Sequence, residues 1–290
     1  MVDASWLRRG GAAVPGPVGD AARLLVAGDT HGDVNWIGSL AKMARRFGCQ
    51  GVVQLGDFGM WPDQQVKRDA KRAVPNERWM DAVANTVARH DVWLAYVDGN
   101  HDFHPGYRER YPVLASGVRP IRDGAVSWLD RGAVVEWCGV RFGALGGAIS
   151  IDRAVRRPGW EHWATEAIAS DECLALVDRA GGRGIDVLLA HDCPSGVSIP
   201  DIRPLDDITL EIDCKHNRDM VRDVVGELRP TLVLHGHYHR RYSSGLWLGE
   251  HQARVEGLAS DLEAHVFGAS WCVLEVPSLR IVDDVAELPE

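Results

Sequence analysis

The 290-residue chain lacks the features that mark membrane-spanning, secreted and duplex-binding proteins. It contains no stretch near the roughly 20 apolar residues that a membrane helix needs. Residues 1–22 have a Gly/Pro/Ala-rich middle and no apolar core, so they do not resemble a secretory signal. A net charge of −9 argues against a broad basic surface for nucleic acid, and six cysteines without a CxxC spacing fit free thiols in a reducing cytoplasm. We therefore expect a cytoplasmic protein with no membrane segment and no extended duplex partner.

Three common catalytic motifs are also missing. The glycine-rich run at 143–147 has no Lys-Ser/Thr pair, so it is not a P-loop, and no GxSxG nucleophile elbow is present. Cys173 and Arg179 have the Cys-x5-Arg spacing of cysteine phosphatases, but the residues between them contain no glycine and continue a helical pattern. Such a segment does not wrap a phosphate with its backbone. The chemistry of this chain must therefore come from other residues.

Short apolar runs alternate with helical patterns, which is typical of a layered α/β protein. The predicted strands lie at 23–29, 51–57, 92–99, 184–192 and 231–236, and the predicted amphipathic helices lie at 34–48 and 76–90. The pattern changes after residue 120. Residues 125–147 predict two or three antiparallel strands with Cys138-Gly139 as a hairpin tip, and 243–282 is again rich in strands. We expect two sheets in a single domain over residues 23–290, preceded by a loose arm at 1–22.

Side chains that bind metals follow all five of these strands. They are Asp29 and His31, then Asp57, then Asn100 with His101 and Asp102, then His191, and finally His237 with His239. Ligand sites in such folds lie beyond the carboxyl ends of the strands. In an extended chain residues i and i+2 share a face, so we expect His237 and His239 to converge with Tyr238 turned away. One buried histidine or one loop-starting aspartate means little, but five successive endings of this kind indicate a metal site.

In this order the five endings resemble the motifs of the calcineurin-like metallophosphoesterases. The matching runs are Asp29-Thr30-His31, Gly56-Asp57, Gly99-Asn100-His101-Asp102, His191 and Gly236-His237-Tyr238-His239, within about residues 23–240. The resemblance implies an α/β fold, a four-layer α/β/β/α sandwich of two mixed sheets flanked by helices. The GDFGMWP run at 56–62 is similar to that of small bacterial and bacteriophage-type phosphodiesterases. Met60 stands where many members have a second Asp, so that residue's supporting role is missing or supplied elsewhere.

The resemblance also implies a dinuclear metal centre. One divalent ion would be held by Asp29, His31, Asp57 and His239, and the other by Asp57, Asn100, His191 and His237. Asp57 would bridge the two ions, and a metal-bridging hydroxide would attack the phosphorus. His101 would protonate the leaving oxygen, and Asp102 would orient His101 and raise its pKa. Manganese is the expected metal, with iron, zinc, nickel or cobalt as alternatives. His235 falls outside this frame and is expected to be either a packed residue or a partner of the metal ligands.

The substrate prediction depends on one loop, residues 150–163. It carries Arg153, Arg156, Arg157 and Trp160, and arginines bind phosphate while tryptophans stack on bases. The alternative is a solvated loop whose tryptophans pack on the fold. We expect hydrolysis of small phosphodiesters, nucleotides such as 2′,3′-cyclic nucleotides in particular. A phosphomonoesterase, a dinucleoside polyphosphate hydrolase and a nuclease on the same fold remain open. A metal-bound interaction module without turnover is the alternative of another class, and the oligomeric state is left open.

Overall fold

The computed structural model describes residues 16–17, 19, 22–63, 73–263 and 268–287. Its helices are α1 (Val34–Arg46), α2 (Glu77–Arg89), α3 (His104–Arg110), α4 (Ser170–Ala180) and α5 (Ile208–Leu228), with single 3-10 turns at η2 (Arg153–Val155), η3 (Asp261–Glu263) and η4 (Val285–Glu287). The two helices predicted from apolar spacing are confirmed as α1 and α2. No helix in these ranges is long and apolar enough to cross a membrane. The predicted arm at 1–22 lies largely outside the described residues.

Within the described ranges the first sheet has seven strands. Their order is β13 (Arg280–Val282), β12 (Trp271–Glu275), β1 (Arg23–Ala27), β2 (Gly51–Leu55), β3 (Trp93–Val97), β5 (Val126–Leu129) and β4 (Val118–Arg122). β1, β2, β3 and β5 are parallel, whereas β12 and β4 run antiparallel to their neighbours. The central strands are almost wholly buried because helices and the second sheet cover their two faces.

The second sheet has six strands in the same described part of the chain. Their order is β10 (Tyr242–Leu248), β11 (His251–Gly257), β9 (Leu232–His235), β8 (Val187–Ala190), β7 (Val140–Leu145) and β6 (Val134–Trp137). The predicted hairpin joins β6 to β7, and both Cys138 and Gly139 at its tip have positive φ. β5 does not extend this hairpin. It joins the first sheet instead, where Val126 and Trp128 pack into the core below the helices.

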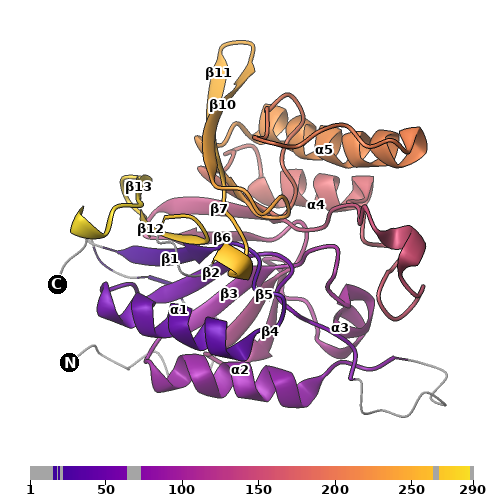
Figure 1. Ribbon diagram of the computed structural model, residues 1–290. Coiled ribbons are helices and arrows are strands. Elements are labelled where there is room, and N and C mark those ends of the chain that lie inside the picture. The colour runs from indigo at the N-terminus through magenta and orange to yellow at the C-terminus, as the bar shows by residue number, and fades with distance from the viewer. Residues whose placement is uncertain (1–15, 18, 20–21, 64–72, 264–267, 288–290) are drawn as a thin grey trace.

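Three apolar cores separate four layers, with α1 and α2 on one side of the paired sheets and α4 and α5 on the other (Figure 1). Leu25 of β1 lies in the core beneath α1 and α2, whereas its neighbour Leu24 lies between the sheets. On β9, Leu234 lies in the inter-sheet core and Val233 lies beneath α5. Successive residues of a strand thus pack alternately against the other sheet and against the helices. The predicted α/β/β/α sandwich is confirmed.

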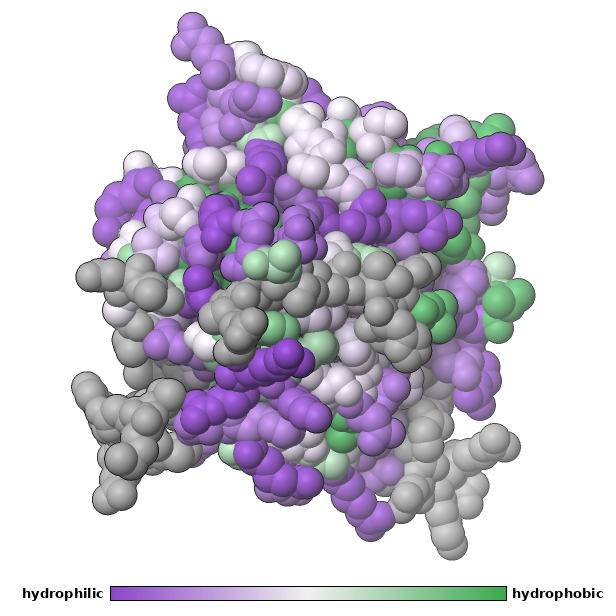
Figure 2. Space-filling view, turned by 60° about the vertical axis from the view of Figure 1, so that its left-hand side comes forward, coloured by the Kyte–Doolittle hydropathy of each residue, from purple (hydrophilic) through white to green (hydrophobic). Residues whose placement is uncertain are grey.

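Figure 2 shows a mostly hydrophilic face on which the hydrophobic side chains form small, separate patches. The β10–β11 hairpin projects from the body, and its Trp247 is 64% exposed (Figure 1). Scattered apolar residues of this kind are ordinary for a folded protein and mark no site.

Candidate metal centre

The carboxyl ends of five parallel strands bring the candidate side chains into one region. The loop after β1 carries Asp29 and His31, the loop after β2 carries Asp57, and the loop after β3 carries Asn100 and His101; His191 follows β8, and His237 and His239 follow β9. β1 to β3 belong to the first sheet, whereas β8 and β9 belong to the second. Both sheets therefore contribute side chains to this region.

Asp29, His31 and His239 form the first set of donors. Their candidate ligand atoms all lie within 4.8 Å of one another. His239 Nε2 is 3.0 Å from Asp29 Oδ2, and His31 Nε2 is 4.0 Å from the same oxygen. His31 Nδ1 lies 2.7 Å from Asp261 Oδ1. If His31 donates its Nδ1–H to Asp261, the Nε2 lone pair faces the site. Asp261 follows no motif and lies 230 positions away in the sequence, so no local pattern predicts this contact.

His191, Asn100 and Asp57 form the second set. His191 Nε2 is 3.0 Å from Asn100 Oδ1 and 3.5 Å from Asp57 Oδ1. His191 Nδ1 lies 2.8 Å from the Leu55 carbonyl oxygen, which accepts its proton and leaves the Nε2 lone pair facing the other two side chains. The His237 ring packs beside that of His191, with 5.0 Å between centroids. His237 therefore lies on the side of the second set.

Asp57 lies between the two sets. Its Oδ2 is 3.8 Å from His31 Nε2, whereas its Oδ1 is 3.5 Å from His191 Nε2. The ligand atoms of Asp29, Asp57 and His191 also lie within 4.8 Å of one another. The two sets are adjacent, and one carboxylate faces both.

Two buried carboxylates give the region its negative charge. Asp29 is 1% exposed and Asp57 is 2% exposed. Burial raises the pKa of each, but nearby histidines, His239 for Asp29 and His101 for Asp57 foremost, hold both pKa values below their usual range. Burial lowers the pKa of His31, but the carboxylates of Asp29, Asp57 and Asp261 together outweigh it and raise that pKa. Ionised buried carboxylates that face imidazole nitrogens are a donor set that fits divalent cations.

The conformation of a loop, and not the pleat of a strand, determines the direction of the His237 and His239 side chains. β9 ends at His235, and His237 and His239 have left-handed backbones with φ of 68° and 52°. The prediction that an extended chain directs both to one face is wrong, although both rings reach the region. His31 and Asp57 also have positive φ, 42° and 50°. Such backbones cost on the order of 1–3 kcal/mol each and gather at functional sites.

Two glycines of the motifs make room for the aspartates. A Cβ at Gly99 would overlap the Asp57 carboxylate, and a Cβ at Gly236 would overlap the Asp29 carboxylate. Both positions therefore need a residue without a side chain.

His101 lies at the edge of the second set. Its Nε2 is 3.7 Å from Asp57 Oδ2 and 3.3 Å from Arg156 Nη2. Its buried Nδ1 has no hydrogen-bond partner among the described residues. The imidazole is thus held by its Nε2 side, next to the carboxylate that faces both donor sets.

Asp102 has a different position from the one predicted. Its carboxylate is fully buried and accepts hydrogen bonds from the backbone N–H groups of Phe58, Gly59, Met60 and Gly99, at 3.1, 2.9, 2.9 and 2.8 Å. The prediction that Asp102 orients His101 is wrong, because four backbone donors occupy its oxygens. Asp102 instead ties the loop after β2 to the loop after β3. One of the four donors is the N–H of Met60, the residue in the position of the motif's second Asp.

The arginine loop is only partly at the site. Arg156 contacts His101 and is held by Asp152, with 2.6 Å between Arg156 Nε and Asp152 Oδ1. Arg153 instead pairs with Asp213 of α5 at 2.5 Å, and both residues line a neighbouring pocket.

Arg157 and Trp160, the other two residues predicted for substrate binding, have no contact with the donor sets in the described part of the structure. Arg157 pairs with Glu161, and its side chain is 56% exposed. Trp160 is half-buried, and its backbone N–H donates to the Arg157 carbonyl. The nearby Trp163 packs against Phe103, which agrees with the alternative prediction that the tryptophans of this loop pack on the fold. Arg156 is thus the arginine of the loop that lies beside the donor sets.

Comparison with known proteins identifies the family. The family described as calcineurin-like phosphoesterase matches residues 22–241. The crystal structure of TT1561 of Thermus thermophilus is similar with a TM-score of 0.52 and 15% identity, over 90% of this chain and 97% of that one. A dimetal phosphatase from Danio rerio is similar with a TM-score of 0.54 and 14% identity, over 89% and 93% of the two chains. These two likenesses show the fold alone, and no curated protein matches. Because the family match spans most of the chain and covers both donor sets, the chain belongs to the calcineurin-like phosphoesterase family and is a metal-dependent phosphoester hydrolase.

Proposed function

We propose that this protein hydrolyses small phosphodiesters, nucleotides such as 2′,3′-cyclic nucleotides in particular, with two divalent cations. The observation that carries the proposal is the position of Asp57. Its Oδ2 faces His31 and its Oδ1 faces His191, so one carboxylate is shared by two donor sets. A shared carboxylate of this kind holds two cations at the short separation that phosphoryl transfer uses.

The donor sets divide between the two cations. Asp29, His31, Asp57 and His239 would hold one, and Asp57, Asn100, His191 and His237 would hold the other. When bound, the cations would neutralise phosphoryl oxygens and make a water molecule acidic enough to attack phosphorus. Mixed nitrogen and oxygen donors suit manganese, our proposed metal, and also iron, zinc, nickel and cobalt.

Two residues at the edge would act on the substrate. Arg156 Nη2, held in place by Asp152, would bind a non-bridging phosphoryl oxygen. We assign to His101, in its protonated form, the transfer of a proton from Nε2 to the leaving oxygen; Arg156, which can only donate, would leave Nε2 to bind the phosphoryl oxygen. This role of His101 does not depend on Asp102, whose oxygens are bound to backbone N–H groups.

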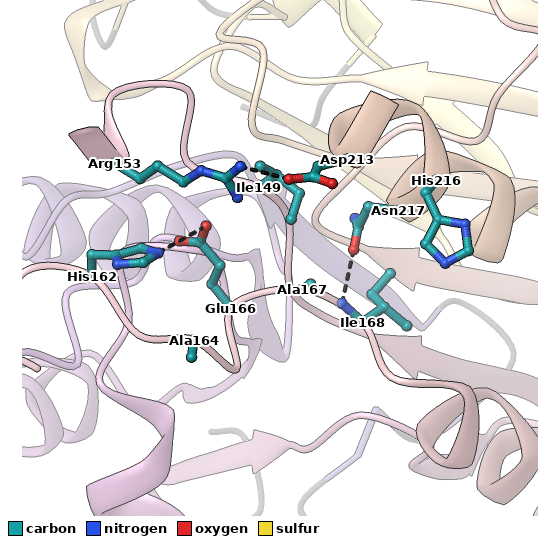
Figure 3. A pocket seen from close by; sticks show the side chains of 10 residues that line it. All are labelled: Ile149, Arg153, His162, Ala164, Glu166, Ala167, Ile168, Asp213, His216 and Asn217. Carbon is teal, nitrogen blue, oxygen red and sulfur yellow. Dashed lines mark hydrogen bonds and ion pairs between the residues drawn. The ribbon is translucent and has the colours of Figure 1, made fainter. Parts of the chain in front are cut away.

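A neighbouring pocket supports a substrate with an organic group. The pocket has a volume of about 460 Å³ and is lined by Ile149, Arg153, His162, Ala164, Glu166, Ala167, Ile168, Asp213, His216 and Asn217 (Figure 3). This volume lies in the range of small-molecule sites, roughly 300–1,000 Å³. Glu166 of the pocket wall accepts a hydrogen bond from Ser150, which in turn contacts Asn100. The pocket is therefore two hydrogen bonds away from the second donor set.

The test is a substrate panel assayed on metal-depleted protein with added Mn²⁺. Bis-p-nitrophenyl phosphate should be hydrolysed, and a 2′,3′-cyclic nucleotide should have a higher kcat/KM than a 3′,5′-cyclic nucleotide, a dinucleoside polyphosphate or a monophosphate. A higher kcat/KM for monophosphates would refute the diester proposal. Binding of two cations without turnover of any substrate would favour an interaction module. The cytoplasmic location and the single domain over 23–290 remain predictions.

A further inference from the structure

Ser150 lies between Asn100 and Glu166 in a buried chain of hydrogen bonds. Asn100 Nδ2 is 3.0 Å from Ser150 Oγ, and Ser150 Oγ is 2.6 Å from Glu166 Oε2. The backbone N–H of Ser150 also donates to Glu166 Oε1 at 3.1 Å. All three residues are at most 2% exposed; Glu166 also lines the pocket, where His162 Nε2 is 3.4 Å from its Oε1. None of the motifs in the sequence includes Ser150 or Glu166.

The number of protons available in this hydrogen-bond network determines the orientation of the Asn100 amide. A serine hydroxyl has one proton, and Ser150 gives it to the Glu166 carboxylate, which is only an acceptor. Ser150 Oγ must then accept from Asn100, which requires the amide NH₂ to lie on that side. Asn100 Oδ1 is thereby left on the side of His191 Nε2, 3.0 Å away. In the reverse orientation an NH₂ group would point at the cation and repel it.

Both ends of this hydrogen-bond network, Asn100 and Glu166, are anchored to one buried ion pair, Asp98 with Arg131. Asp98 precedes Asn100 by two residues, and its carbonyl accepts the N–H of Gly147, in the segment that leads to Ser150. Arg131 Nε is 2.8 Å from Asp98 Oδ2. The Arg131 guanidinium also donates to the carbonyls of residues 165, 166 and 167. These hydrogen bonds hold the backbone of Glu166 in place. The spacing between Asn100, Ser150 and Glu166 is therefore set by the fold, as a preorganised site requires.

We propose that Ser150 and Glu166 are positioning residues that keep Asn100 Oδ1 directed at the second cation. The inference rests on the proposed function in one respect, namely that Asn100 holds that cation. Ser150 and Glu166 do not touch the cation or the substrate in this proposal, and they act through the orientation of one amide. The effect of their loss should therefore fall on one of the two cation sites.

Two substitutions test the proposal, Ser150→Ala and Glu166→Gln. Alanine removes Ser150 Oγ, the nearer of the two groups that face the Asn100 NH₂; the other is His101 Nε2 at 3.3 Å. Glutamine has the shape of glutamate but only one acceptor oxygen, so its NH₂ must face either the N–H or the hydroxyl of Ser150. Mn²⁺ binding to the metal-depleted protein is measured by calorimetric titration. We expect each variant to lose about 10–100-fold in affinity at one site, as is typical for partners of metal ligands, with the other site unchanged.

Glu161→Gln is the matched control, because Glu161 lies in the same loop but pairs with the exposed Arg157. Its two Mn²⁺ affinities should equal those of the wild type. A second comparison uses Asn100→Asp, whose carboxylate presents an oxygen in either orientation. In that background Ser150→Ala should change the affinity by less than about 3-fold, since the two positions act as a unit.

Three outcomes would overturn the inference. In the first, Ser150→Ala and Glu166→Gln bind both ions with wild-type affinity. In the second they weaken both sites equally, and in the third Ser150→Ala acts with full strength in the Asn100→Asp background. The last two results would indicate a general structural role. A wild-type protein that binds fewer than two cations would instead refute the proposed function itself, so the two failures are distinguishable.

Discussion

Replacement of Asp102 by Asn tests whether this residue supports the loops or acts on His101. The Asp102 carboxylate binds four backbone N–H groups, two on each oxygen. Oδ1 accepts from Gly59 and Met60, and Oδ2 accepts from Phe58 and Gly99. Asparagine keeps the shape of the side chain but replaces one oxygen by an NH₂ group. Two backbone donors would then face a third donor inside the protein.

The expected effect is a large loss of stability. Each buried donor without a partner costs about 1–3 kcal/mol, so two of them cost about 2–6 kcal/mol. Burial and the neighbouring Asp57 carboxylate raise the pKa of Asp102 to about 7, which means that the buried charge is itself unfavourable. Removing that charge offsets part of the loss. We therefore expect the free energy of unfolding to fall by about 2–4 kcal/mol.

Urea unfolding of the metal-depleted protein measures this change. Asp33→Asn is the control, because Asp33 caps α1 with Oδ1 alone, accepting from Asn35 and Trp36, and asparagine retains that oxygen. The control should stay within about 0.5 kcal/mol of the wild type, since Asn and Asp are equally good caps. If Asp102→Asn is as stable as the wild type but has a reduced kcat with metals bound, our interpretation is refuted and a role in orienting His101 is restored.

Three further predictions concern the site and one concerns the stability of the fold. Asp57→Asn should abolish turnover and lower the bound manganese measured by mass spectrometry; unchanged metal content would contradict a shared ligand. His101→Gln should lower kcat by about 10²–10⁴-fold with both metals retained, and loss of metal would argue against a proton-transfer role. Arg156→Ala should raise the KM for bis-p-nitrophenyl phosphate by about 10–100-fold, the effect of one charge-assisted hydrogen bond, whereas Arg157→Ala should leave it unchanged. Burial, aided by nearby arginines, lowers the pKa of His104 from 6.5 to about 3, so only the unfolded chain binds this proton between those values. Stability should therefore fall as pH drops below 6.5, by about 2 kcal/mol at pH 5 from this residue, and His104→Gln should have a correspondingly shallower pH dependence in urea unfolding.

The strands and the candidate ligands could be predicted from the sequence because both are local features. A buried parallel strand needs a short apolar run, and the residues that follow it necessarily lie at the edge of the sheet. Asp261, Ser150 and Glu166 could not be predicted in this way. Asp261 contacts His31 across 230 positions, and Ser150 contacts Asn100 across 50. Such contacts depend on how the two sheets and their loops pack, which no periodicity in the chain records.

The difference between local sequence features and long-range packing also explains the two histidines. Strand alternation selected His237 and His239 correctly, although it is not what directs them to the site. His237 and His239 are two residues apart in the sequence, but their left-handed backbones belong to a loop that other loops hold in place. Asp29 Oδ1 accepts the N–H of His237, and Asp57 Oδ1 accepts the N–H of His101. The aspartates thus fix the backbones that carry the histidines, in addition to facing them. Charge and loop conformation are therefore coupled at this site, and replacing a carboxylate should disturb the position of its histidine partners as well as remove a ligand.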